Sequence, residues 1–162
     1  SQYREGPVAI RYPRGSGTAK RIRRSFTILE TGKAEALREG GDAVLLAVGE
    51  MVPVCVRAAE IAASDGIETT VVNMRFIHPL DGGLLEDTLK RNVPVFTVED
   101  NVIAGGFGSA VLEYAASHGH TAPVTLIGIP DEFAPHAPRN RLLERYGLTA
   151  EAIAGRLRKV RT

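Results

Sequence analysis

The feature that most constrains the fold of this sequence is a strand-like segment followed by glycines and then by a helical pattern. Residues 93–98 are mostly apolar, as in a strand that is buried in a parallel sheet. Glycines between residues 105 and 108 allow a tight turn or a close approach of the backbone to a neighbour. Residues 107–118 then place apolar side chains on one face of a helix. The stretch predicts one strand–helix unit of an α/β domain.

The same alternation recurs on both sides of this unit. The sequence predicts a small hairpin at residues 26–38, strands at 43–49, 69–73 and 123–127, and helices at 52–63, 81–89, 139–146 and 149–161. Asp81 is a natural N-cap for the second of these helices. Strands that alternate with helices favour a mainly parallel sheet. We therefore expect an α/β fold with a mainly parallel, five-stranded sheet, helices on both faces, and an N-terminal arm.

Charge and length narrow the class of protein. The 162 residues suit one domain of ordinary size plus an arm. Lys and Arg number 20 against 19 Asp and Glu, so no net field attracts nucleic acid or an acidic membrane. A single cysteine fits the reducing cytoplasm, and no apolar run is long enough to span a bilayer. Because the chain begins without methionine, we expect it to be a piece of a longer protein.

The glycine turn has two interpretations. A helix N-terminus attracts anions, but the spacing Gly106-x-Gly108 continues to Val111 and does not complete a dinucleotide fingerprint. The favoured interpretation is that the glycines permit a tight turn and close helix–sheet or subunit packing. Glu99 and Asp100, at the end of the strand, are placed to act as acid or base, or to cap the following turn.

The sequence does not contain a self-contained catalytic set. No zinc-type partners accompany the histidines, which are His78, His118, His120 and His136. Cys55 lies on the apolar face of a predicted helix and is expected in the core. Ser109 is not in a nucleophile elbow. We therefore predict no catalytic, cofactor-binding or metal-binding residue in this chain.

Two arginines are the candidate ligand-binding residues. Residues 6–11 read as a short buried strand, and Arg11 and Arg14 stand at its carboxyl end, where α/β proteins bind ligands. A surface arginine pair is the alternative. The basic residues of the following segment, 16–24, are expected to be solvated linker positions.

Several motifs together carry more information than the periodicity. They are Ile10-Arg11-Tyr12-Pro13-Arg14-Gly15, Met74-Arg75-Phe76-x-x-Pro79-Leu80-Asp81, Thr97-Val98-Glu99-Asp100-Asn101, Gly105-Gly106-x-Gly108-Ser109 and Gly128-Ile129-Pro130-Asp131-x-Phe133. In this order they resemble the C-terminal quarter of the 1-deoxy-D-xylulose-5-phosphate synthase family, which is transketolase-like. The similarity extends over essentially the whole chain.

The resemblance implies a domain division and a reaction. Residues 1–25 would be the last strand of a pyrimidine-binding domain with a linker, and residues 26–162 a transketolase C-terminal domain with one antiparallel strand. The full enzyme depends on thiamine diphosphate and Mg²⁺ and condenses pyruvate with glyceraldehyde 3-phosphate, with loss of CO₂, on the route to isoprenoid precursors. We also expect the full enzyme to be a homodimer in the cytoplasm, with the upstream domains of the same enzyme as partners of this chain.

The resemblance also assigns roles to the two arginines. Arg14 would bind the phosphate of the aldehyde, and Arg11 would be a second contact or a structural neighbour. The cofactor, metal and catalytic residues of the family precede Ser1, so this chain alone is expected to be inactive. Two alternatives remain open at this point: a non-catalytic C-terminal domain of a 2-oxo acid dehydrogenase β-type subunit, and a small-anion-binding α/β module that uses the Gly105–Ser109 turn.

Overall fold

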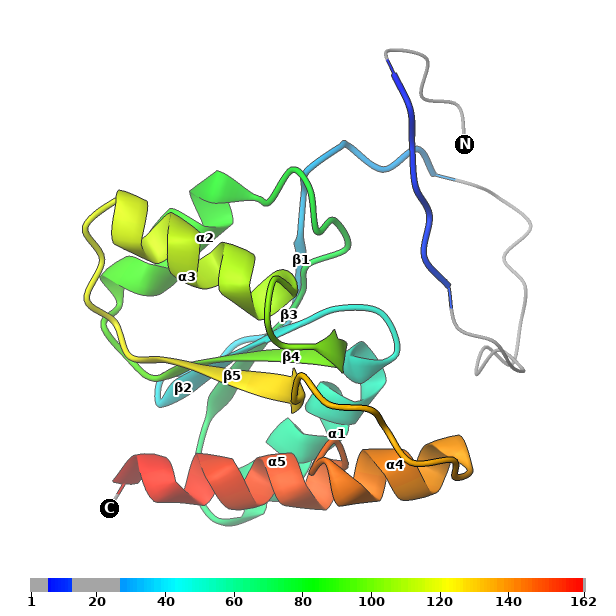
Figure 1. Cartoon of the computed structure of the whole chain (residues 1–162). Coiled ribbons are helices and arrows are strands. Elements are labelled where there is room, and N and C mark those ends of the chain that lie inside the picture. The colour runs from blue at the N-terminus through cyan, green and yellow to red at the C-terminus, as the bar shows by residue number, and fades with distance from the viewer. Residues whose placement is uncertain (1–5, 13–26, 162) are drawn as a thin grey trace.

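A five-stranded sheet forms the centre of the computed structural model, which describes residues 6–12 and 27–161 (Figure 1). The strands have the order β1-β3-β2-β4-β5, and only β1 runs antiparallel to its neighbour. Their bounds are β1 Glu35–Arg38, β2 Ala43–Ala47, β3 Thr69–Asn73, β4 Val95–Val102 and β5 Val124–Ile129. The predicted α/β class and the mainly parallel five-stranded sheet are confirmed.

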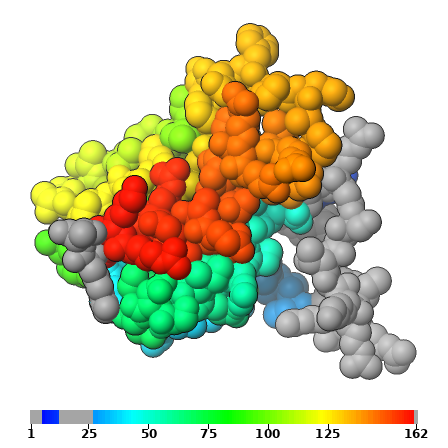
Figure 2. Space-filling view, turned by 90° about the horizontal axis from the view of Figure 1, so that it is seen from below, coloured from blue at the N-terminus to red at the C-terminus, as the bar shows by residue number. Residues whose placement is uncertain are grey.

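Helices cover both faces of the sheet, as expected. One face carries α1 (Met51–Ser64), α4 (Arg139–Arg145) and α5 (Ala150–Leu157), which continues into the 3₁₀ turn η1 (Arg158–Arg161). The other face carries α2 (Gly82–Lys90) and α3 (Phe107–Ser117). Figure 2 shows α1 and α5 side by side on the first face.

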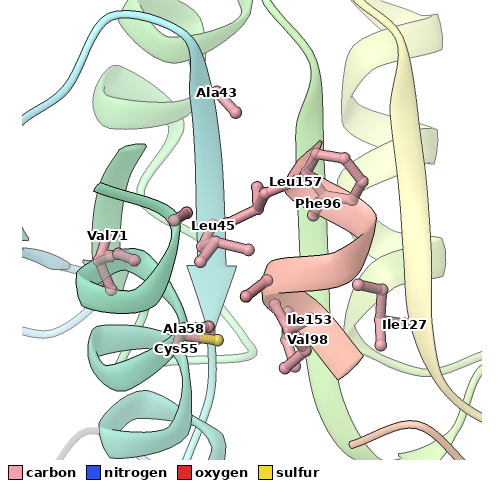
Figure 3. Packing of buried hydrophobic residues seen from close by; sticks show 14 of the residues in the cluster. Ala43, Leu45, Cys55, Ala58, Val71, Phe96, Val98, Ile127, Ile153 and Leu157 are labelled. Atoms are coloured by element: carbon pink, nitrogen blue, oxygen red, sulfur yellow. The ribbon is translucent and has the colours of Figure 1, made fainter. Parts of the chain in front are cut away.

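The central strand β2 explains why the core has two halves. Its side chains alternate between the two faces, because successive residues of a strand point in opposite directions. Leu45 contributes to the cluster beneath α1 and α5 shown in Figure 3, whereas Val44 and Leu46 pack toward α2 and α3. All residues of β2 are fully buried, which accounts for its continuous apolar sequence.

Local capping signals in the sequence mark where helices begin. The carboxylate of Asp81 accepts the N–H of Leu84 at 3.1 Å, as predicted for an N-cap. The hydroxyl of Thr149 accepts the N–H of Ala152 at 3.3 Å and caps α5 in the same way. These two caps explain the start of α2 and α5 from short-range chemistry alone.

The predicted hairpin at residues 26–38 is wrong. A turn does occur there, with Gly32 at a φ of +73° and the N–H of Lys33 donating to Glu30 O at 3.2 Å. Residues 27–30, however, form no strand, and Glu35–Arg38 pairs antiparallel with β3 instead. The open edge of β3 offers this segment a partner already attached to the core, which a separate two-stranded ribbon lacks.

The predicted burial of residues 6–11 is also wrong for this chain. Residues 7–12 are extended but do not join the five-stranded sheet, and Ile10 is 65% exposed. Figure 1 shows this arm on the side of the sheet toward which β4 and β5 point. The segment 13–26, which holds Arg14, the boundary expected at residue 25 and the basic linker, lies outside the described residues.

The strand order creates a switch point beside β2. From β2 the chain passes to β3 on one side and afterwards to β4 on the other side. In open α/β sheets a crevice forms at the carboxyl ends of two such strands, and ligands bind there. In this chain the residues that follow β2 and those at the end of β4 meet at that edge. Within the described ranges, no helix is long and apolar enough to cross a membrane.

Candidate functional site

The N-terminus of α3 is occupied by a carboxylate of the chain itself. Glu99 lies within β4 and is 2% exposed. Its Oε2 accepts the N–H of Phe107 at 2.9 Å, and its Oε1 accepts the N–H of Gly108 at 2.8 Å. These are charge-assisted bonds to the donors that a helix start leaves unpaired. Of the two roles weighed for Glu99, capping of the following turn is confirmed.

The glycines around this carboxylate are required by space. A Cβ at Gly106 would meet Glu99 Oε2 at 2.5 Å, and one at Gly108 would meet Thr97 Oγ1 at 2.5 Å. A Cβ at Gly128, on the neighbouring strand β5, would lie 3.2 Å from Glu99 Cγ. The interpretation that the glycines permit a tight turn and close helix–sheet packing is therefore confirmed, with the contacts lying inside the chain.

The same geometry removes the anion site at this turn. An external phosphate would need the N–H groups of Phe107 and Gly108, and Glu99 already accepts both. The side chain of Ser109 is engaged as well, since it accepts the N–H of Gly105 at 3.1 Å and donates to Ile103 O at 2.8 Å. The turn is a completed structural motif.

Asp100, the next residue, joins the arm to the domain. Its carboxylate Oδ2 accepts a hydrogen bond from Arg139 Nη2 at 3.0 Å. Arg11 Nη2 donates to the backbone O of Asp100 at 3.3 Å and lies 3.9 Å from its Oδ1. Arg139 Nη1 in turn lies 3.6 Å from Glu50 Oε2. Two carboxylates and two guanidinium groups thus form one network at the carboxyl edge of the sheet.

Of the two predicted substrate-binding residues, the structure describes Arg11. Its side chain is 59% exposed, although one nitrogen is engaged by Asp100. A guanidinium has several N–H donors in a planar fork, which suits a phosphate or carboxylate. Arg11 therefore stands at the carboxyl edge of the sheet with an exposed guanidinium. Arg14 follows it by three positions in the sequence and lies outside the described residues.

Cys55, His118 and His120 have structural roles. Burial raises the pKa of the Cys55 thiol to about 12, which leaves it protonated and unreactive. The ring of His118 stacks on Tyr114 and its backbone ends α3, while His120 Nε2 lies 2.7 Å from Glu86 Oε2. Among the described residues, no group of His, Cys, Asp and Glu has the arrangement of a metal site.

A hollow beside β1 and α2 is also lined by charged residues. Arg91 in its wall donates to Thr70 Oγ1 at 3.0 Å and also to the backbone O of Gly40. Asp81, also in the wall, is held by its cap on α2 and by the N–H of Ala34 at 3.0 Å. These contacts join α2 to β3 and to the residues on either side of β1.

Comparison with known proteins identifies the domain. The family described as "Transketolase, C-terminal domain" matches residues 32–153. The chain belongs to the transketolase C-terminal domain family. A solved structure with this fold, "Split gene transketolase, inactive beta4 tetramer", superposes with a TM-score of 0.75 at 35% identity, over 82% of this chain and 43% of that one.

Curated relatives of this transketolase C-terminal domain carry one name. "1-deoxy-D-xylulose-5-phosphate synthase" of Desulforudis audaxviator is 49% identical over 150 residues, which is 92% of this chain and 24% of the relative. The synthase of Pelotomaculum thermopropionicum is 50% identical over 149 residues, and that of a Geobacillus strain is 42% identical over 160. The resemblance inferred from the motifs is confirmed, and the chain spans about a quarter of the length of these relatives.

Two residues at the edge of this transketolase C-terminal domain were not predicted from the sequence. Arg139 is the first residue of α4, and Glu50 immediately precedes α1. Arg139 meets Asp100 across 39 positions of sequence, and Arg11 meets Asp100 across 89. Short-range patterns carry no signal for such pairs. The available signal is topological, since both residues follow the carboxyl ends of parallel strands.

Proposed function

We propose that this chain is the C-terminal region of a thiamine-diphosphate-dependent synthase that condenses pyruvate with glyceraldehyde 3-phosphate, with loss of CO₂, to 1-deoxy-D-xylulose 5-phosphate. The observation that carries the proposal is the 49% and 50% identity to synthases of that name over more than nine-tenths of the chain. The product would feed isoprenoid biosynthesis. Because those relatives are about four times as long, the activity belongs to a longer polypeptide and this chain alone would be inactive.

The cofactors would be held outside this chain. When bound, thiamine diphosphate supplies the carbanion chemistry that decarboxylates pyruvate. The described residues do not fit it or its Mg²⁺: the anion-binding helix start of α3 is occupied by Glu99, and the described acidic residues lack the grouping of a metal site. We therefore assign diphosphate and metal binding to the part of the longer protein that this chain does not include.

The contribution of this chain to chemistry would be substrate binding. Arg14 is the proposed ligand of the aldehyde's phosphate, because a guanidinium makes paired, charge-assisted bonds to phosphate oxygens. Arg11 is the proposed second contact or positioning neighbour. Its place at the carboxyl edge of the sheet, with an exposed guanidinium, supports this assignment.

The arm would complete a sheet of the upstream domain. Val8, Ile10 and Tyr12 alternate along it and are 54%, 65% and 81% exposed. An extended segment with apolar side chains at every second position is typical of a strand that is buried on one face. We propose that residues 1–25 are the last strand of the pyrimidine-binding domain with a linker, and that residues 26–162 form the C-terminal domain.

Assembly and compartment follow from the same proposal. The longer protein would act as a homodimer in the cytoplasm, with this domain contributing to domain packing and dimer contact. The structural neighbour is named as a transketolase tetramer, which supports an assembly of several copies. The buried, reduced Cys55 is compatible with a reducing compartment.

Product analysis tests the proposal. The polypeptide at its native length, supplied with thiamine diphosphate, Mg²⁺, pyruvate and glyceraldehyde 3-phosphate, is expected to form 1-deoxy-D-xylulose 5-phosphate and CO₂. The chain of residues 1–162 is the matched control and is expected to form neither. An acceptor reaction with lipoamide in place of the aldehyde would instead indicate the 2-oxo acid dehydrogenase alternative. Product formation by the short chain alone would contradict the proposal.

A further inference from the structure

Within residues 6–12 of the arm, Arg11 makes polar contacts with the domain. Arg11 Nη2 contacts both the backbone O of Asp100, at 3.3 Å, and its carboxylate, at 3.9 Å. The hydrogen bond to the backbone O places the guanidinium beside β4, and the carboxylate adds an attraction between opposite charges. The side chain of Asp100 is 25% exposed, so it is partly shielded from water. Arg11 is therefore placed by Asp100 at the edge where the proposed substrate phosphate binds.

Asp100 is itself held from its other side. Its Oδ2 accepts a hydrogen bond from Arg139 Nη2 at 3.0 Å, while its Oδ1 is the oxygen nearest Arg11. Arg139 is anchored in turn by Glu50, 3.6 Å away at the start of α1. The two oxygens of one carboxylate thus serve two arginines from opposite ends of the chain. The network is neutral in charge, so it needs no external ion.

These contacts are expected to hold the arm in place and to contribute little to the stability of the domain. Exposed ion pairs contribute little individually to global stability, whereas networks with shared partners hold a local geometry better. The core clusters beneath the sheet do not include Asp100, Arg139 or Arg11. Loss of the Asp100 carboxylate should therefore leave the domain folded and free the arm to move.

We propose that Asp100, held by Arg139, is a positioning residue that orients the guanidinium of Arg11. The proposal rests on the proposed function, since it assigns the network to recognition of a phosphorylated aldehyde. It adds a residue of the C-terminal domain to substrate binding without direct contact with the substrate. The effect should therefore fall on the affinity for the phosphorylated substrate.

Kinetics of the native-length protein give the first test. Asp100→Asn is expected to raise the KM for glyceraldehyde 3-phosphate about three- to ten-fold, the range that corresponds to loss of a networked charge contact. The KM for pyruvate and the KM for unphosphorylated glyceraldehyde should change less than about two-fold. Asp100→Glu, which keeps the charge, should restore most of the affinity. Equal changes in the KM values for both aldehydes would overturn the proposal.

A double-mutant cycle shows whether Asp100 acts through Arg11. In an Arg11→Gln background, Asp100→Asn should have little further effect on the KM for glyceraldehyde 3-phosphate. Additive effects would overturn the proposal. Asp65→Asn is the matched control. Asp65 forms a different surface ion pair, with Arg158 Nε at 2.8 Å, and takes no part in the network of Asp100. It should leave every KM unchanged.

Hydrogen–deuterium exchange gives a readout that does not depend on catalysis. In Asp100→Asn, amides in a peptide spanning residues 7–12 should exchange faster, whereas those of β2 and β4 should exchange at the original rate. If the native-length protein makes no deoxyxylulose phosphate but this change in exchange occurs, the proposed function fails and the positioning role stands. Unchanged exchange over residues 7–12 would overturn the positioning role.

Discussion

Glu99 Oε1 accepts the N–H of Gly108 at 2.8 Å, so a carboxylate of β4 caps the first turn of α3. The bond joins two residues that the sequence separates by a glycine-rich turn. Since Glu99 is 2% exposed, neither water nor a ligand replaces it readily. The relationship explains why glycines gather at this turn and why the turn is not a phosphate site.

Removal of this carboxylate should destabilise the chain. Glu99→Ala leaves the N–H groups of Phe107 and Gly108 buried without a partner, at a cost of about 1–3 kcal/mol each. We expect the free energy of unfolding, measured by urea titration, to fall by about 3 kcal/mol. Glu99→Gln, which keeps one acceptor oxygen, should have an unfolding free energy between those of the original chain and of Glu99→Ala. Glu113→Ala, an exposed position of the same helix, should change stability by less than about 0.5 kcal/mol.

A methyl group at Gly108 should be unfavourable. It would meet Thr97 Oγ1 at 2.5 Å and Leu126 Cδ2 at 2.7 Å, so the helix would have to move away from the sheet. Gly108→Ala is expected to lower the unfolding free energy by about 1–3 kcal/mol. Gly155→Ala is the control, because it has open space in α5 and should raise stability by about 0.5–1 kcal/mol. A stable Gly108→Ala variant would refute the close-packing account.

Asp81 should make the stability depend on pH. Burial raises its pKa, but the N–H groups of Ala34 and Leu84 and the charge of Lys33 outweigh burial, so the pKa lies below its usual value. A lowered pKa in the folded state stabilises the fold above the unfolded-state pKa of about 3.9. The contribution is lost as the pH falls through the folded-state pKa.

The variant Asp81→Asn isolates the part of the pH-dependent stability that comes from the Asp81 carboxylate. It loses one of two accepted N–H bonds, so at pH 7 the unfolding free energy should fall by about 1 kcal/mol. The difference from the original chain should shrink below about pH 4 in urea titrations at several pH values. Asp87→Asn, on the exposed side of α2, should show no such pH dependence. A difference that grows toward acid would contradict the assignment.

Cys55 should be inert until the domain unfolds. Its thiol is fully buried and its pKa is raised to about 12 by burial, so almost no thiolate forms at pH 8. We expect no labelling of the native chain by a thiol-disulfide reagent over the time in which the urea-unfolded chain is labelled completely. Rapid labelling of the folded chain would show that α1 opens readily.

The sequence predicts those strands and helix starts that depend on residues close together in the chain. Residues 69–72 are all β-branched, and β3 occupies residues 69–73. Asp81 and Thr149 cap helices through bonds to residues three positions ahead. In such cases the partner is close in sequence, so composition and spacing contain the answer.

Strand pairings and side-chain contacts between residues far apart in the chain could not be predicted from the sequence pattern. Glu35–Arg38 had a hairpin partner in the sequence, but the open edge of β3 provides a better one. Glu99 was compatible with acid–base chemistry until its two N–H partners were placed. Asp100 and Arg139 lie 39 positions apart, and only the topology of the sheet brings them together.

The most direct test of the central claim measures substrate affinity at Arg14 in the native-length protein. Arg14→Gln should raise the KM for glyceraldehyde 3-phosphate by about ten-fold or more, since paired charge-assisted bonds to phosphate are lost. The KM for pyruvate should change less than about two-fold. Equal increases for both substrates, or no increase for the phosphorylated aldehyde, would contradict the claim that this chain supplies the phosphate-binding arginine.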